Sequence, residues 1–88
     1  MSEYIERGLE IRELSKTLVT QFMRSEPACG SDSLGLKTSE IFRACGFDWG
    51  EKSNATSSSQ QSWFVALLRE LEELGVIERV ESKQWRIK

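Results

Sequence analysis

The residue types that could do chemistry here are carboxylates, hydroxyls, two thiols and several cations, because the chain of 88 residues contains no histidine. Histidine is the commonest general base near neutral pH, so Ser-His-Asp and Cys-His arrangements are excluded and an enzyme is the least supported class. Cys29 and Cys45 lie far apart and supply two ligands where a structural zinc takes four, so we expect no metal. The six glycines match no phosphate-binding loop, and we expect no cofactor.

Positive charge gathers near the C-terminus. Residues 76–88 carry four Lys or Arg against two Glu, a local excess of +2 in a chain whose net charge is −2. Cations on a hairpin suit contacts with DNA phosphates, which makes Arg79, Lys83 and Arg86 candidate contacts. Such residues also keep an exposed hairpin soluble and prevent edge pairing, and this alternative stays open.

The start of a leucine-rich segment offers a second polar surface. Projection of its residues at about 100° per residue places the following opposite the leucines or on their flanks: Ser58, Ser59, Gln61, Ser62, Val65, Ala66, Arg69 and Glu73. Ser and Gln can donate and accept at base edges, and Val65 or Ala66 could meet a thymine methyl. The far end of this helix is acidic, so only its first turns suit a DNA groove. The alternative is a solvated helix start without a partner.

Two further groups of residues could contact partners. Lys52 and Asn54 precede the leucine-rich helix, and Lys37 and Thr38 precede an earlier helix. They are phosphate candidates, Lys37 and Thr38 of second rank, because helix N-termini present free backbone N–H groups. In the irregular segment 46–53, the aromatic pair Phe47 and Trp49 either anchors the loop on the core or contacts a protein partner.

The N-terminal part of the chain must form an amphipathic helix over residues 9–23. Its apolar residues recur at three- and four-residue steps and predict one buried stripe: Ile11, Leu14, Leu18, Val19, Phe22 and Met23. Pro27 and the small polar residues after it end this helix. Residues 1–8 either fray or extend it, and an extension carrying Tyr4, Ile5 and Leu9 could support a homodimer.

Two shorter segments follow that position the candidate contacts. A short helix begins near Thr38, where a hydroxyl can cap it and Glu40 complements its dipole, and it ends at Gly46. The next helix is predicted to begin at two overlapping capping boxes, Ser57 with Gln60 and Ser58 with Gln61. It continues to Gly75 and buries one face: Phe64, Leu67, Leu68, Leu71 and Leu74.

The C-terminal residues predict a β-hairpin, with strands at 76–80 and 84–88. A two-residue turn at Ser82 and Lys83 would place Val80 opposite Trp85 and Arg79 opposite Arg86. Two facing arginines cost stability unless an anion relieves them, and a phosphate would do so.

The order of helix, short extended piece, helix, longer helix and hairpin resembles the winged helix-turn-helix superfamily over about residues 9–88. The resemblance rests on the segments TSEIFRACGF (38–47) and WFVALLRELEELGVIERV (63–80), above all on the leucine-rich helix that closes in LGVIER before a strand. It implies an α+β, mostly helical fold of three helices with a C-terminal β-hairpin wing. Superfamily members usually bind duplex DNA, with the third helix in the major groove and the wing on the backbone, and some are protein-interaction modules. The long link between the second and third helices departs from a tight helix-turn-helix.

The length of 88 residues predicts a single domain. The resemblance implies that residues 1–88 form one winged-helix domain that binds double-stranded DNA and regulates transcription. The net charge of −2 excludes a uniformly basic surface, so any DNA site is a local patch. The longest apolar run, Trp63 to Leu68, is far too short to span a bilayer, and the first residues are acidic rather than typical of a signal peptide. We therefore expect a cytoplasmic protein without a membrane partner. A protein-interaction module without DNA binding is the alternative function.

Overall fold

The N-terminal helix α1 (Ser2–Ser25) is the longest element of the chain, and one turn of 3-10 helix, η1 (Pro27–Cys29), follows it. The computed structural model describes residues 2–81 and 83–88. The remaining elements are β1 (Leu36–Lys37), α2 (Thr38–Ala44), α3 (Ser57–Gln60), α4 (Ser62–Glu73), β2 (Ile77–Val80) and β3 (Gln84–Ile87). The chain is thus a small α+β domain that is mostly helical.

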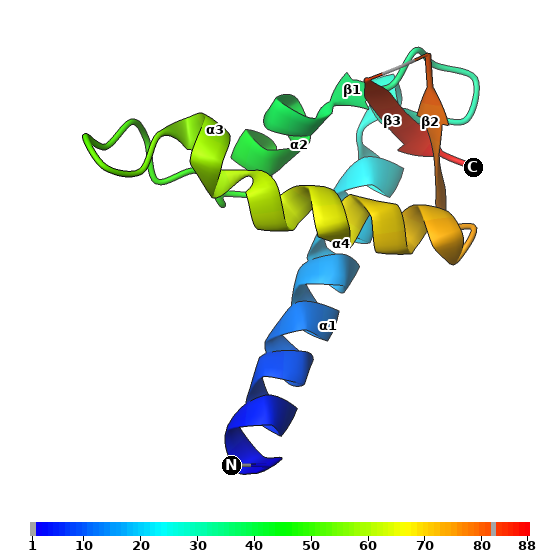
Figure 1. Ribbon diagram of the computed structural model, residues 1–88. Helices are drawn as coiled ribbons and strands as arrows, with labels where there is room; N and C mark the ends of the chain where they lie inside the picture. The colour runs from blue at the N-terminus through cyan, green and yellow to red at the C-terminus, as the bar shows by residue number, and fades with distance from the viewer. Residues whose placement is uncertain (1, 82) are drawn as a thin grey trace.

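The strands form an antiparallel sheet in the order β1-β3-β2. In Figure 1 the β2–β3 hairpin stands at the C-terminal end of α4, while α3 and the loop before it lie at the other end. The first half of α1 projects away from the rest of the molecule (Figure 1). No helix among the described residues is both long and apolar enough to cross a membrane.

The core lies where α1, α2, α4 and the sheet meet. Its fully buried side chains include Phe42 of α2 and Phe64 of α4, whose ring centroids are 5.2 Å apart. Cys29 is also fully buried, and desolvation raises the pKa of its thiol to about 11. Cys29 therefore lies in the core, at the end of η1, as an unreactive thiol.

Helix α1 contacts the core only through its second half. Lys16, Val19 and Met23 are buried, whereas every residue from Ser2 to Leu14 is exposed. The predicted buried stripe is wrong in part, because Ile11, Leu14 and Leu18 are 65%, 69% and 42% exposed. Of the two alternatives for residues 1–8, fraying or a helical extension, the structure shows the extension, because α1 begins at Ser2.

A salt bridge ties the middle of α1 to α4. The Lys16 Nζ donates to Glu70 Oε1 at 2.8 Å, and Lys16 also pairs with Glu13. These carboxylates raise the pKa of Lys16, and Lys16 lowers the pKa of Glu70. Both charged forms are therefore favoured where α1 crosses α4.

The helix starts differ from the predicted caps. For α2 the capping residue is Lys37, whose backbone N–H donates to the Glu40 carboxylate at 2.9 Å, so no hydroxyl caps this helix. For α3 the capping residue is Thr56, whose hydroxyl accepts from Ser59 N, one residue before the predicted Ser57. The predicted single helix is divided at Gln61 into α3 and α4.

The hairpin is shifted by one residue from the predicted register. Val80 pairs with Gln84, Arg79 with Trp85 and Glu78 with Arg86. Strand β2 ends at Val80 and β3 begins at Gln84, and Glu81 adopts a left-handed conformation with φ of 55°. Ser82, one of the two residues of the predicted turn, lies outside the described residues. The predicted opposition of Arg79 and Arg86 is therefore wrong, and each arginine instead faces a residue that complements it.

Candidate nucleic-acid interface

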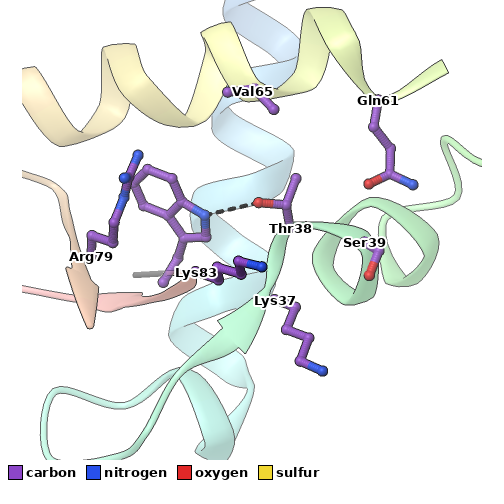
Figure 2. A pocket seen from close by; sticks show the side chains of 8 residues that line it. Lys37, Thr38, Ser39, Gln61, Val65, Arg79 and Lys83 are labelled. Atoms are coloured by element: carbon purple, nitrogen blue, oxygen red, sulfur yellow. Dashed lines mark hydrogen bonds between the residues drawn. The ribbon is translucent and has the colours of Figure 1, made fainter. Parts of the chain in front are cut away.

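A cleft of about 310 Å³ opens between the start of α2, the start of α4 and the hairpin (Figure 2). Its lining combines three cations with polar and apolar side chains: Lys37, Thr38, Ser39, Gln61, Val65, Arg79, Lys83 and Trp85. Lys37 and Thr38 lie where β1 passes into α2, Gln61 and Val65 belong to the start of α4, and the last three belong to the hairpin. Segments far apart in the sequence thus converge on one small surface.

Trp85 holds the cleft together. It is 2% exposed, and its indole Nε1 donates to Thr38 Oγ1 at 3.0 Å, which links β3 to α2 (Figure 2). The Thr38 hydroxyl therefore accepts a hydrogen bond from the sheet and does not cap the start of α2. Because Trp85 lies opposite Arg79 in the hairpin, both side chains are on one face of the sheet.

Arg79 stacks on this tryptophan. Its guanidinium carbon lies 4.8 Å from the centroid of the Trp85 ring, a distance suited to a cation–π interaction. The Arg79 Nε is buried and has no hydrogen-bond partner among the described residues. The stacking restricts the side chain, so its charge is presented at the cleft at a lower entropic cost than a freely rotating arginine would incur.

The cleft is electrostatically one-sided. None of its eight lining residues carries a negative charge, and within residues 2–81 and 83–88 no salt bridge engages Lys37, Arg79 or Lys83. Lys37 and Lys83 are exposed. The cleft is thus a local positive patch in a chain of net charge −2, and it suits an anion.

Arg86 is not part of this patch. Its Nε donates to Glu78 Oε2 at 2.6 Å and its Nη1 to the carbonyl oxygen of Ser33 at 3.0 Å. The one-residue shift in register places Arg86 on the face of the hairpin opposite Arg79. Arg86 therefore joins the hairpin to the segment between η1 and β1.

The other predicted contacts lie outside the cleft. Ser58, Ser59, Ser62 and Arg69 are exposed along α3 and α4, as the helical projection requires, and Lys52 and Asn54 are exposed in the preceding loop. Lys52 forms an isolated β-bridge with Ala55. Arg69 makes a long contact of 3.5 Å with Glu72. These residues extend the surface beside the cleft but do not converge with its cations.

Gln60 organises the loop in front of α3. Its Nε2 donates to the carbonyl oxygens of Gly50 at 2.8 Å and Ala55 at 2.9 Å, and its Oε1 accepts from Trp49 N at 2.9 Å. The long link between α2 and α3 is therefore ordered by hydrogen bonds rather than by a tight turn.

Asp48 is the second centre of the same loop. Its carboxylate accepts from Gly50 N at 2.6 Å, Ser57 Oγ at 3.1 Å and Arg43 Nε at 3.1 Å. The backbone donor contributes most to lowering the pKa of Asp48, and Ser57 and Arg43 add to it. The loop thus depends on an ionised aspartate.

The two loop aromatics differ in their surroundings. Phe47 is partly buried in an aromatic cluster, with its ring centroid 5.2 Å from Trp63 and 5.6 Å from Phe64. Trp49 is 79% exposed. Only Trp49 is thus free to contact a partner, while Phe47 anchors the loop.

Sequence reasoning missed Ser39 and Trp85 as cleft residues. The alternation of side chains in a strand could have placed Trp85 on the inner face of the hairpin, but its link to Thr38 spans 47 positions. Ser39 lies in the first turn of α2, whose start near Thr38 was predicted, but its spacing gives no sign that it faces the hairpin. No local sequence pattern predicts that Ser39 or Trp85 lines the cleft.

Comparisons with protein-family models, with curated proteins and with solved structures find no match for this chain. The fold and the site define a small α+β domain with a cationic cleft between helix starts and a hairpin. The functional argument therefore rests on the residues themselves.

Proposed function

We propose that this chain is a winged-helix DNA-binding protein that regulates transcription. The start of α4 enters the major groove of duplex DNA, and the β2–β3 hairpin acts as a wing against the backbone. The order of elements supports the proposal, since α1, β1, α2, α4 and the hairpin follow one another as in the superfamily that the sequence resembles.

The observation that carries the proposal is the convergence of Lys37, Arg79 and Lys83 on one cleft without a carboxylate among the lining residues. Counterion release makes phosphate contacts by Lys and Arg favourable even in an acidic protein, provided that the cations are clustered. Three separate segments supply them, so the clustering is a property of the fold rather than of a basic run in the sequence.

The start of α4 supplies groups for reading bases beside the cations. Gln61 Nε2 donates to the carbonyl oxygen of Ser57 at 3.2 Å, which leaves its second N–H and its Oε1 to meet a base edge. Val65 offers an apolar contact of the kind that a thymine methyl makes. The acidic residues Glu72 and Glu73 lie at the far end of α4, away from the phosphate contacts. Bases therefore meet the neutral end of the helix.

An NMR titration of isotope-labelled protein with a mixed-sequence duplex tests the proposal. At low salt we expect amide shifts at Lys37, Gln61, Val65, Arg79 and Lys83 that fade as salt rises toward physiological concentration. The segment around Arg86 serves as an internal control, because its guanidinium is already bound within the protein. An absence of shifts at low salt contradicts DNA binding.

The second candidate function is a protein-interaction module on the same fold, favoured by the exposure of Trp49. A tryptophan that is 79% exposed on an ordered loop is the type of side chain that anchors protein interfaces. Under this alternative, Trp49→Ala abolishes binding to a co-purifying protein while Lys83→Ala leaves it intact. Weaker binding of duplex DNA by Lys83→Ala, with unchanged DNA binding by Trp49→Ala, favours the first proposal.

A further inference from the structure

Helix α1 carries large apolar side chains that the other described residues leave exposed. Six large side chains are between 42% and 69% exposed on α1: Tyr4, Ile5, Leu9, Ile11, Leu14 and Leu18. Every residue from Ser2 to Leu14 is exposed, and this half of the helix projects from the body (Figure 1). A helix of this length without tertiary contacts is marginal in water, so its apolar side chains need a partner surface.

The size of the surface fits a second copy of the chain. At about 100° per residue, Tyr4, Ile11, Leu14 and Leu18 lie on one face of α1, whereas Ile5 and Leu9 lie on the opposite face and do not join them in one helix pair. The exposed parts of the four side chains on the first face amount to roughly 450 Å². Two copies that cover each other therefore bury about 900 Å² of these side chains, in the range of a weak, concentration-dependent interface. A groove of about 680 Å³ between α1 and α4 adjoins this surface and shares Ile11 with it.

The spacing of the residues matches a helix pair. Tyr4, Ile11 and Leu18 recur every seven residues, and Leu14 lies three residues after Ile11, as in the apolar seam of paired helices. Gly8 lies beside this seam in the wall of the groove, and a Cβ added there meets nothing within 4 Å. A second helix can therefore approach closely at Gly8.

We propose that the chain forms a two-fold dimer in which α1 packs antiparallel against α1 of a second copy, with Ile11 close to the axis. In this arrangement Tyr4 lies opposite Leu18 of the partner subunit, and Gly8 lies opposite Leu14 of the partner subunit, so large side chains meet small or complementary ones. A parallel pair would instead bring the seam residue Arg7 against its own copy, which is unfavourable. The inference does not depend on DNA binding.

Sedimentation equilibrium of the full chain tests the dimer. We expect a concentration-dependent mass that approaches twice the monomer mass, and Ile11→Glu raises the dissociation constant at least about 30-fold because it removes a residue at the centre of the interface. The matched control is Leu74→Glu, which makes the same kind of change at a leucine that is 63% exposed after α4. It leaves the dissociation constant unchanged. A wild-type chain that stays monomeric at the concentrations used for NMR overturns the proposal and leaves this surface to a different protein.

Gly8→Leu provides a second variant that the monomer tolerates. Leucine favours helix more than glycine does, and the space beside Gly8 is open in the single chain. We expect circular dichroism to show retained or increased helix and the dissociation constant to rise about tenfold, because the leucine overfills the contact with the partner. An unchanged or stronger dimer contradicts the placement of Gly8 in the interface.

Cross-linking determines the orientation. In a Cys45→Ser background, Ile11→Cys should form an intermolecular disulfide on mild oxidation, because residue 11 lies near the axis. Leu18→Cys should not, since the two copies of residue 18 are separated by about 21 Å along antiparallel helices. Buried Cys29 stays unreactive in both variants. Cross-linking at both positions indicates a parallel pair and overturns the antiparallel arrangement.

Discussion

Replacing Lys83 with alanine tests the cationic cleft most directly. Lys83 is exposed in the connection between β2 and β3, and no contact within the described residues depends on its charge, so the variant should fold as the wild type does. If Lys37, Arg79 and Lys83 each neutralise one phosphate, the plot of log K against log salt has a slope of about −2.7. Between about 50 and 200 mM salt the wild-type affinity then falls about 40-fold.

Loss of one cation reduces the slope to about −1.8 and the fall in affinity over the same range to about 12-fold. The assay is the fluorescence anisotropy of a labelled mixed-sequence duplex, titrated with protein at several salt concentrations. Lys37→Ala should give the same reduced slope, because Lys37 is the other exposed cation of the cleft.

Lys88→Ala is the matched control, since it removes the same charge from an exposed residue beyond the end of β3. It should keep a slope near −2.7. Equal slopes for the Lys83 and Lys88 variants would refute the reasoning, because binding would then follow net charge rather than the cleft.

Three further predictions concern the fold that supports the cleft. Gln60→Ala should lower the free energy of unfolding by about 1–2 kcal/mol in urea titrations, because three loop hydrogen bonds are lost; an unchanged midpoint would contradict this. Gly35→Ala should cost at least about 2 kcal/mol in the same assay, since Gly35 has φ of +84° and its added Cβ would lie 2.5 Å from the Trp85 carbonyl oxygen. The lowered pKa of Asp48 means that its ionised form stabilises the fold above the unfolded-state pKa and that this stability is lost as the pH falls through the folded-state pKa. The difference in unfolding free energy between wild type and Asp48→Asn should therefore narrow on acidification, and a difference independent of pH would count against the role of the carboxylate.

Features with a strong local signature were predictable from the sequence. The spacing of Phe64, Leu67, Leu68 and Leu71 predicts α4, and these four residues are buried. Gly75, with φ of +78°, follows the helix as predicted. Leu74 has the right spacing but is exposed, and it lies just beyond Glu73, the last residue of α4. Periodicity predicts which side chains share one face of a helix. How far along the helix that face stays buried depends on tertiary contacts.

The sequence allowed individual cleft residues to be predicted, but not that they line one cleft. Lys37, Gln61, Arg79 and Lys83 each follow from residue type and position, but no local pattern brings them together. The error over Arg86 shows the reason. A side chain changes face when the register shifts by one residue, and the shift depends on whether Glu81 joins the connection in a left-handed conformation. Glycine or asparagine would have signalled that conformation, and glutamate does not.

Helix α1 shows what an apolar pattern leaves undetermined. Its sequence has apolar residues on two faces, and the structure buries the one that includes Val19 and Met23 while it exposes Ile11, Leu14 and Leu18. Spacing alone cannot distinguish a face that packs in the core from one that packs on another chain, because burial stabilises both in the same way. The buried side chains of Val19 and Met23 and the Lys16–Glu70 salt bridge hold α1 on the core by one face, so the seam residues stay exposed. Because the core holds one face of α1, the opposite face is available to a partner. Weakening the Lys16–Glu70 salt bridge should therefore weaken dimer association as well as lower the free energy of unfolding.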